Sequence, residues 1–173
     1  MLGFYSSQTV RKGFTLVELL LYISCAGVML TTVALFLSLV LKTRVHSQVI
    51  AEVDGQGQQI VTIVSQLLRN ATQITLPAAQ GSGTTLGFTV PDGAKSPTIF
   101  SLVGGALTLK EGNGATVALT NNRVTVSAVN FRNLSRPVTP GTARLEFTLT
   151  YINPTGRSEY SYAQSFVGSA SLY

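Results

Sequence analysis

The sequence predicts an α+β protein in which one long N-terminal helix packs on a C-terminal antiparallel β-sheet head. Three observations predict this fold class. Residues 14–41 form an apolar run, residues 42–76 continue it with apolar residues at helical spacing, and residues 77–173 contain short strand-like runs separated by turn signals. A chain of 173 residues has room for one domain with a real core, and not for two.

The first apolar run is long enough to cross a membrane. Residues 14–41 contain one charged residue, Glu18, and no proline. A bilayer-spanning helix needs about 20 residues, whereas the apolar part of a secretory signal has only about 7–15. No small-x-small cleavage site follows the run, so we expect the segment to stay in the mature protein as an anchor. Basic residues flank both ends, and charge alone therefore leaves the orientation open.

The helix is expected to continue through residues 42–76 with one apolar face. Polar residues fall between the apolar ones, which is typical of a helix that lies against a globular head. Gly55 and Gly57 would weaken this part by about 1 kcal/mol each relative to alanine, and Pro77 would end the segment. The expected apolar stripe consists of Val45, Val49, Val53, Ile60, Ile63, Val64, Leu67 and Leu68.

The head, residues 77–173, is expected to be an antiparallel sheet packed on the second half of the helix. Glycine, asparagine and proline turns separate the strand-like runs, and short connections favour antiparallel neighbours in a single meander. Residues 78–83 are expected to be a flexible link between helix and sheet. The expected strands are 84–90, 98–103, 106–110, 116–120, 124–131, 144–152 and 159–167.

The N-terminus carries the most specific motif in the chain. The sequence Lys12-Gly13-Phe14-Thr15-Leu16-Val17-Glu18 directly precedes and enters the apolar run. It resembles the cleavage and methylation motif of type IV pilins, pseudopilins and competence pilins. The resemblance implies a pilin-like fold and a leader, residues 1–13, that prepilin peptidase removes after Gly13. The same peptidase would then methylate the new amino terminus on Phe14.

The resemblance also implies a role for Glu18 in assembly. A carboxylate one turn into an apolar helix is costly in lipid unless it is paired. In the family that this chain resembles, its partner is the amino terminus of a neighbouring subunit, here on Phe14. The implied partners are other pilin subunits, prepilin peptidase and the pilus assembly machinery. The protein would be a single-pass protein of the cell membrane before assembly, and part of an extracellular or periplasmic pilus or pseudopilus afterwards.

The sequence gives little support for catalysis. His46 is the only histidine, and Cys25, the only cysteine, lies inside the apolar run. The acidic residues have no metal-ligand spacing, and no glycine-rich phosphate loop is present. We therefore expect a protein that is not an enzyme and that needs neither a metal nor a cofactor.

Two alternatives to a structural pilus subunit remain open. A competence pilin could contact DNA phosphates through basic residues of the head, although scattered arginines are often only solubilising charges. The chain could also be a single-pass membrane protein whose motif is accidental. The candidate DNA-contacting residues are Arg123, Arg132, Arg136, Arg144 and Arg157.

Overall fold

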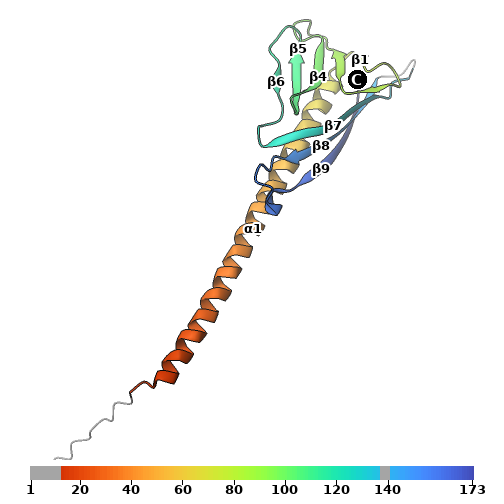
Figure 1. Ribbon diagram of the computed structural model, residues 1–173. Helices are drawn as coiled ribbons and strands as arrows, with labels where there is room; N and C mark the ends of the chain where they lie inside the picture. The colour runs from red at the N-terminus through yellow and green to blue at the C-terminus, as the bar shows by residue number, and fades with distance from the viewer. Residues whose placement is uncertain (1–12, 137–140) are drawn as a thin grey trace, which may run out of the picture. The chain divides into compact units, whose positions relative to one another are not determined.

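The protein consists of one long helix followed by antiparallel strands (Figure 1), which confirms the predicted α+β class. The computed structural model describes residues 13–136 and 141–173. The chain divides into two compact units, one ending at Lys42 and the other comprising Thr43–Tyr173, and helix α1 (Leu16–Arg69) contributes to both. The strands are β1 (Gln73–Leu76), β2 (Ser82–Gly83), β3 (Leu86–Thr89), β4 (Thr98–Val103), β5 (Ala106–Glu111), β6 (Val117–Ala118), β7 (Val124–Asn133), β8 (Thr142–Tyr151) and β9 (Ala163–Ser171), with a short 3₁₀ helix, η1 (Ser158–Tyr160), before the last.

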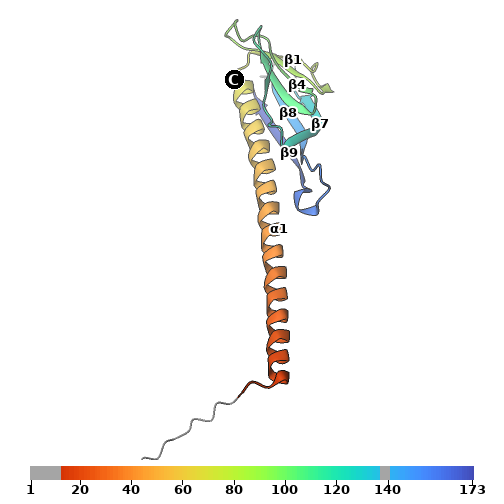
Figure 2. The same ribbon diagram turned by 60° about the vertical axis from the view of Figure 1, so that its left-hand side comes forward.

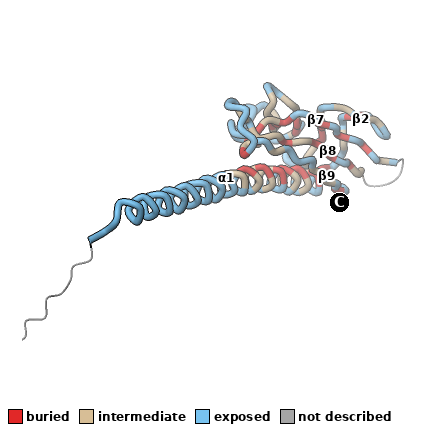
Figure 3. The backbone as a smooth tube through the Cα atoms, turned by 60° about the horizontal axis from the view of Figure 1, so that its bottom comes forward, coloured by how far each residue is buried: buried red, intermediate tan, exposed pale blue. Residues whose placement is uncertain are grey.

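The second half of α1 buries one face against the strands of its own unit. The buried positions recur at three- and four-residue steps, so they lie on one side of the helix. Figure 3 shows this side as a buried stripe that ends where α1 ends, flanked by partly buried positions, whereas the helix up to Arg44 is exposed. The stripe consists of Val49, Val53, Gly57, Ile60, Val64 and Leu68.

The strands form two antiparallel sheets, and the expectation of a single meander is wrong. One sheet has the order β1-β3-β4-β5-β6 and the other the order β2-β7-β8-β9. The chain enters the second sheet first at β2, between β1 and β3, and again after β6, at Asn121 and Asn122, which the sequence presents as one more hairpin turn. Strands β3 to β6 and strands β7 to β9 pair in chain order, whereas β2 pairs with the distant β7. The error therefore lies in the number of sheets and in the partner of β2.

Three further boundaries differ from those expected. The last strand is expected at 159–167, whereas Ser158–Tyr160 form η1 and β9 comprises Ala163–Ser171. The helix ends at Arg69, and Gln73–Leu76 pair with β3 as strand β1, so the helical segment does not reach residue 76. The expected flexible link at 78–83 contains Ser82 and Gly83, which pair with β7 as strand β2. Both strands add to a sheet edge and are short, and short edge strands lack the alternating pattern by which longer ones are found.

One hydrophobic core joins α1 to both sheets. Val53, Ile60 and Val64 from the helix lie in the same buried cluster as Phe100 from the first sheet and Phe147 from the second. Figure 2 shows β9 and β8 alongside the C-terminal half of α1. The helix is therefore an integral part of the head's core.

The closest packing in the head joins α1 to β9 through a reciprocal pair of glycines. Gly57 is buried, and a methyl group at its position would overlap the ring of Phe166 on β9. In the other direction, a Cβ at Gly168 on β9 would lie 2.8 Å from Val61 Cγ1 on the helix. Helix α1 is unbroken at Gly57, so the glycine that the sequence presents as a weak point of the helix serves close packing instead.

Candidate functional site

The expected processing junction lies outside the helix and is exposed. Gly13 and Phe14 precede the first helical residue, Leu16, and a Cβ at Gly13 would meet no described atom within 4 Å. Neither packing nor a positive φ therefore requires glycine here among the described residues. Arg11 and Lys12, like the rest of the expected leader before Gly13, lie outside the described residues.

Glu18 occupies the third position of the helix and is tied to its start. The backbone N–H of Glu18 donates to Thr15 Oγ1 at 3.3 Å, and Leu19 N–H donates to the Thr15 carbonyl at 3.1 Å. Thr15 is therefore the N-cap, and Thr15 and Glu18 have the T-x-x-E spacing of a capping box. A carboxylate in the first turn is also favoured by the helix dipole. The Phe14 and Tyr22 rings lie 5.8 Å apart and cover this first turn from one side.

The first half of α1 presents apolar side chains that no described part of the chain covers. Every residue from Gly13 to Arg44 is exposed, and α1 is long and apolar enough to cross a membrane. Several hydroxyl side chains on this half bond within the helix: Ser24 Oγ donates to the Leu20 carbonyl and Thr31 Oγ1 to the Gly27 carbonyl, each at 2.8 Å. Internal bonding of this kind suits a helix whose surroundings lack water.

The five candidate DNA-contacting arginines do not form one surface. Arg132 on β7 is directly opposite Arg144 on β8, while Arg123 precedes β7 at the other end of the strand pair. Arg132 is eight residue steps along β7 from Val124 (132 − 124 = 8), which corresponds to about 27 Å at about 3.4 Å per residue. All five arginines are exposed, which includes Arg136, the last described residue before position 141, and Arg157, next to η1.

Three of these arginines have carboxylate partners. Arg144 pairs with Glu146 at 2.6 Å, Arg123 lies 3.8 Å from Glu52, and Arg157 pairs with Glu159. Each carboxylate lowers the positive potential that a phosphate would meet at that arginine. Arg132 lies directly opposite Arg144 on the neighbouring strand, and Glu146 offsets the charge of Arg144 in this pair.

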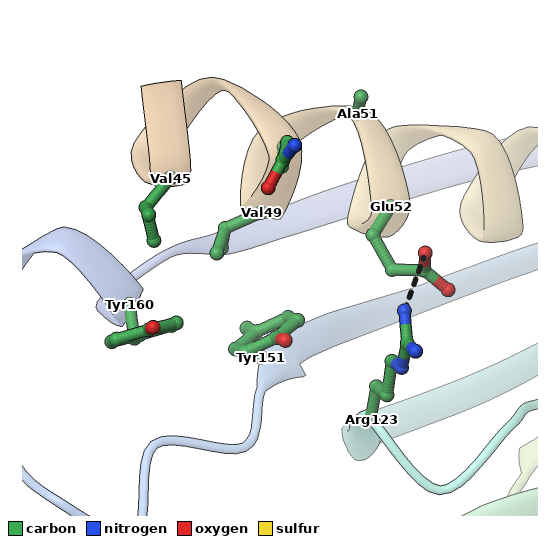
Figure 4. A pocket seen from close by; sticks show the side chains of 8 residues that line it. Val45, Val49, Ala51, Glu52, Arg123, Tyr151 and Tyr160 are labelled. Atoms are coloured by element: carbon green, nitrogen blue, oxygen red, sulfur yellow. Dashed lines mark ion pairs between the residues drawn. The ribbon is translucent and has the colours of Figure 1, made fainter. Parts of the chain in front are cut away.

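A concavity in the head brings together residues that sequence reasoning missed. It has a volume of about 510 Å³ and lies between α1, the end of β8 and η1. Figure 4 shows Val45 and Val49 on one side of it, the rings of Tyr151 and Tyr160 facing them, and Glu52 beside Arg123. No local pattern predicts this site, because helix, strand and 3₁₀ helix contribute to it from positions far apart in the sequence.

Polar contacts hold Glu52 in place at this concavity. Its Oε1 accepts bonds from Gln56 Nε2 and from Asn121 Nδ2, both at 2.6 Å. These two hydrogen bonds, with a smaller contribution from the Arg123 guanidinium, lower the pKa of Glu52 below its ordinary value of 4.5. Glu52 is therefore a carboxylate at neutral pH, and it links α1 to the segment that precedes β7.

Nearby contacts extend this polar seam along the helix. His46 Nδ1 donates to the Glu159 carbonyl at 3.2 Å, and the His46 ring meets Tyr162 edge-on. The Tyr162 hydroxyl donates to Asp54 Oδ1 at 3.4 Å. Burial of its ring, together with the neighbouring Asp54 carboxylate, raises the pKa of Tyr162. The only histidine in the chain thus has a structural role at the base of the head.

Taken together, fold and sites define a class: an α+β protein with one candidate membrane-crossing helix that also forms part of the head's core. No group of three or more metal-ligating side chains occurs among residues 13–136 and 141–173. Comparison with protein-family models, with curated proteins and with solved structures finds no match.

Proposed function

We propose that this chain is a structural subunit, a minor pilin or pseudopilin, of a type IV pilus or a type II secretion-like filament. Prepilin peptidase would cut it after Gly13, and its N-terminal helix would then pack against the helices of neighbouring subunits. The observation that carries the proposal is the arrangement of Gly13, Phe14 and Glu18: an exposed peptide bond, a capped helix start and a carboxylate on an apolar helix.

The exposed apolar first half of α1 supports contact with lipid before assembly and with the helices of other subunits afterwards. Its side chains have no cover in the described chain, and burial of apolar surface contributes about 25 cal/mol for each Å² removed from water. Gly27 has no described atom within 4 Å of its would-be Cβ, so another helix could approach closely at that point.

Processing is tested by co-expression of the full chain with a prepilin peptidase. Intact-mass measurement should show loss of residues 1–13 and one added methyl group on Phe14. Gly13→Ala should still be cut in part, whereas Gly13→Phe should block cutting because the peptidase needs space at that position. Since no described neighbour requires glycine at position 13, neither variant should disturb the fold. An uncut wild-type chain, or a cut elsewhere, contradicts the proposal and favours a single-pass membrane protein with an accidental motif.

Assembly is tested by two substitutions at Glu18. Glu18→Ala removes both the charge and the third-position side chain of the helix, while Glu18→Gln removes only the charge, because glutamine also serves in a capping box. We expect both variants to insert into the membrane and both to be lost from sheared filaments. Normal filament incorporation of Glu18→Gln would limit Glu18 to capping and contradict its pairing with a neighbouring Phe14 amino group.

A DNA-contacting competence pilin is the second candidate, and the cross-strand pair of Arg132 and Arg144 is the observation that favours it. Arg132 could contact one phosphate, and Arg144 could contact a neighbouring phosphate if it released its partner Glu146. Arg132→Ala should then weaken salt-dependent binding of duplex DNA by the full chain, and Arg123→Ala should not, because Arg123 lies at the other end of the strand pair. Equal effects of the two variants would indicate non-specific attraction to a basic protein.

A further inference from the structure

We propose that the concavity between α1, β8 and η1 binds one ring of a neutral saccharide. The inference concerns the head alone and holds whether or not the chain assembles into a filament. All lining residues lie in the unit Thr43–Tyr173. The volume of about 510 Å³ falls within the range of about 300–1,000 Å³ found for small-molecule sites.

Two tyrosines supply an aromatic platform. The rings of Tyr151 and Tyr160 are nearly parallel, with 19° between their planes and 6.1 Å between their centres. Both rings are partly exposed, and Figure 4 shows them facing Val45 and Val49 across the concavity. A sugar ring presents a face of C–H groups, which packs on the electron-rich face of an aromatic ring. Val49 is buried and Val45 is partly exposed, so the platform and Val45 together suit a flat ligand with apolar faces.

Planar polar groups at one side of the platform suit the edge of such a ring. Arg123 Nη1 lies 3.8 Å from Glu52 Oε2, which is beyond hydrogen-bond distance, so the guanidinium and this oxygen keep bonding capacity toward a ligand. Gln48 adds an exposed amide to the lining. Adjacent hydroxyls of a sugar both donate and accept, and they could therefore bridge the carboxylate of Glu52 and the guanidinium of Arg123.

The charge balance selects against ionic ligands. The charged side chains of the lining are Glu52 and Arg123, which face each other. A cationic ligand would meet the Arg123 guanidinium, and an anionic ligand would meet the Glu52 carboxylate. An uncharged polyol avoids both forms of repulsion.

The test uses the full chain in phosphatidylcholine nanodiscs, because maltoside detergents would themselves offer sugars. Chitotriose, lactose and maltotriose are the probes, and saturation-transfer NMR detects their binding. We expect at least one of them to bind with a dissociation constant of about 1 mM, as for a small open site with few polar contacts. Tyr160 is the residue to replace, since Tyr151 also packs against the core whereas Tyr160 does not belong to it.

Four variants decide the site. Tyr160→Ala and Arg123→Ala should each weaken binding about tenfold or more, which corresponds to about 1.4 kcal/mol. Tyr160→Phe, which keeps the ring, and Arg132→Ala, which removes an exposed arginine outside the concavity, should bind as the wild type does.

Absence of binding by all three sugars overturns the proposal. Binding that is unchanged in Tyr160→Ala also overturns it, since the sugar would then occupy another surface. Capture of an aromatic peptide at the site, with no sugar bound, would assign the concavity to a protein partner instead.

Discussion

The two halves of α1 belong to one helix and differ in whether the described chain buries them. Up to Lys42 the helix is apolar on all sides and exposed everywhere, whereas from Val49 onward only one face is apolar and that face is buried. The first half therefore depends on another molecule for cover, while the second half is covered by the strands of its own chain. Burial in the described chain, and not apolar content alone, separates the part of a helix that stabilises a domain from the part that can serve association.

The largest expected effect comes from removing the second half of the helix. A fragment beginning at Val45 keeps the buried stripe and should unfold cooperatively, without a disulfide or metal. A fragment beginning at Asn70 keeps every strand, including β1, but exposes the core residues that α1 covers. It should aggregate or lack a cooperative transition. Thermal melts followed by circular dichroism compare the two, and equally cooperative melting would show that the helix does not stabilise the sheets.

A single core substitution sharpens the same comparison. Ile60 is fully buried in the stripe, and Ile60→Ala should lower the free energy of unfolding by about 2–5 kcal/mol. Leu35→Ala, in the exposed first half, is the control and should leave the unfolding of the head unchanged. Urea unfolding of the full chain in nanodiscs, followed by tyrosine fluorescence, measures both. A comparable loss in the two variants would contradict the division of the helix.

Two glycines of α1 give a matched pair with effects of opposite sign. Gly57→Ala places a methyl group against the Phe166 ring and should destabilise the head by about 1–3 kcal/mol through overpacking. Gly55→Ala meets no atom within 4 Å and should stabilise the helix by about 1 kcal/mol. The same urea experiment applies. Stabilisation by Gly57→Ala would mean that Phe166 moves aside without cost.

The smallest effect concerns the charge of Glu52. The pKa of this carboxyl is lowered in the folded protein, so its charged form stabilises the head above the ordinary pKa of 4.5, and this contribution is lost as the pH falls through the folded pKa. Glu52→Gln should therefore cost under about 1 kcal/mol at neutral pH, since the side chain is partly exposed. The difference from wild type should shrink below pH 4.5. A difference that grows toward acid pH would contradict the direction of the pKa shift; Glu111→Gln on β5 is the control.

Patterns within one element predicted much of this fold. The apolar run and its one-sided continuation identify α1, and Thr98–Val103 is a strand with the bounds that its sequence predicts. In Leu145, Phe147 and Leu149 the alternation of a half-buried strand is visible directly, and all three are buried on β8. These features depend on near neighbours in the sequence, and local periodicity therefore finds them.

Features that depend on distant residues were not predicted. The separation into two sheets follows from which strands pair with one another, and no turn residue encodes it. The neighbouring sequence marks Gly57 only as a poor helix former. Its role in close packing depends on Phe166, more than a hundred positions further along the chain (166 − 57 = 109). The junction expected at Gly13 rests on a contiguous motif, and it stays a prediction. The concavity of Tyr151 and Tyr160 was missed because its parts meet only after folding.

The packing of α1 on β9 within the unit Thr43–Tyr173 has a mechanical consequence. A force along the axis of this part of the helix would have to slide the buried stripe past the strands. The Phe166 ring lies against Gly57, and Val61 lies against Gly168, so side chains from both elements oppose that sliding. Helix and strand are therefore held against shear by contacts in both directions.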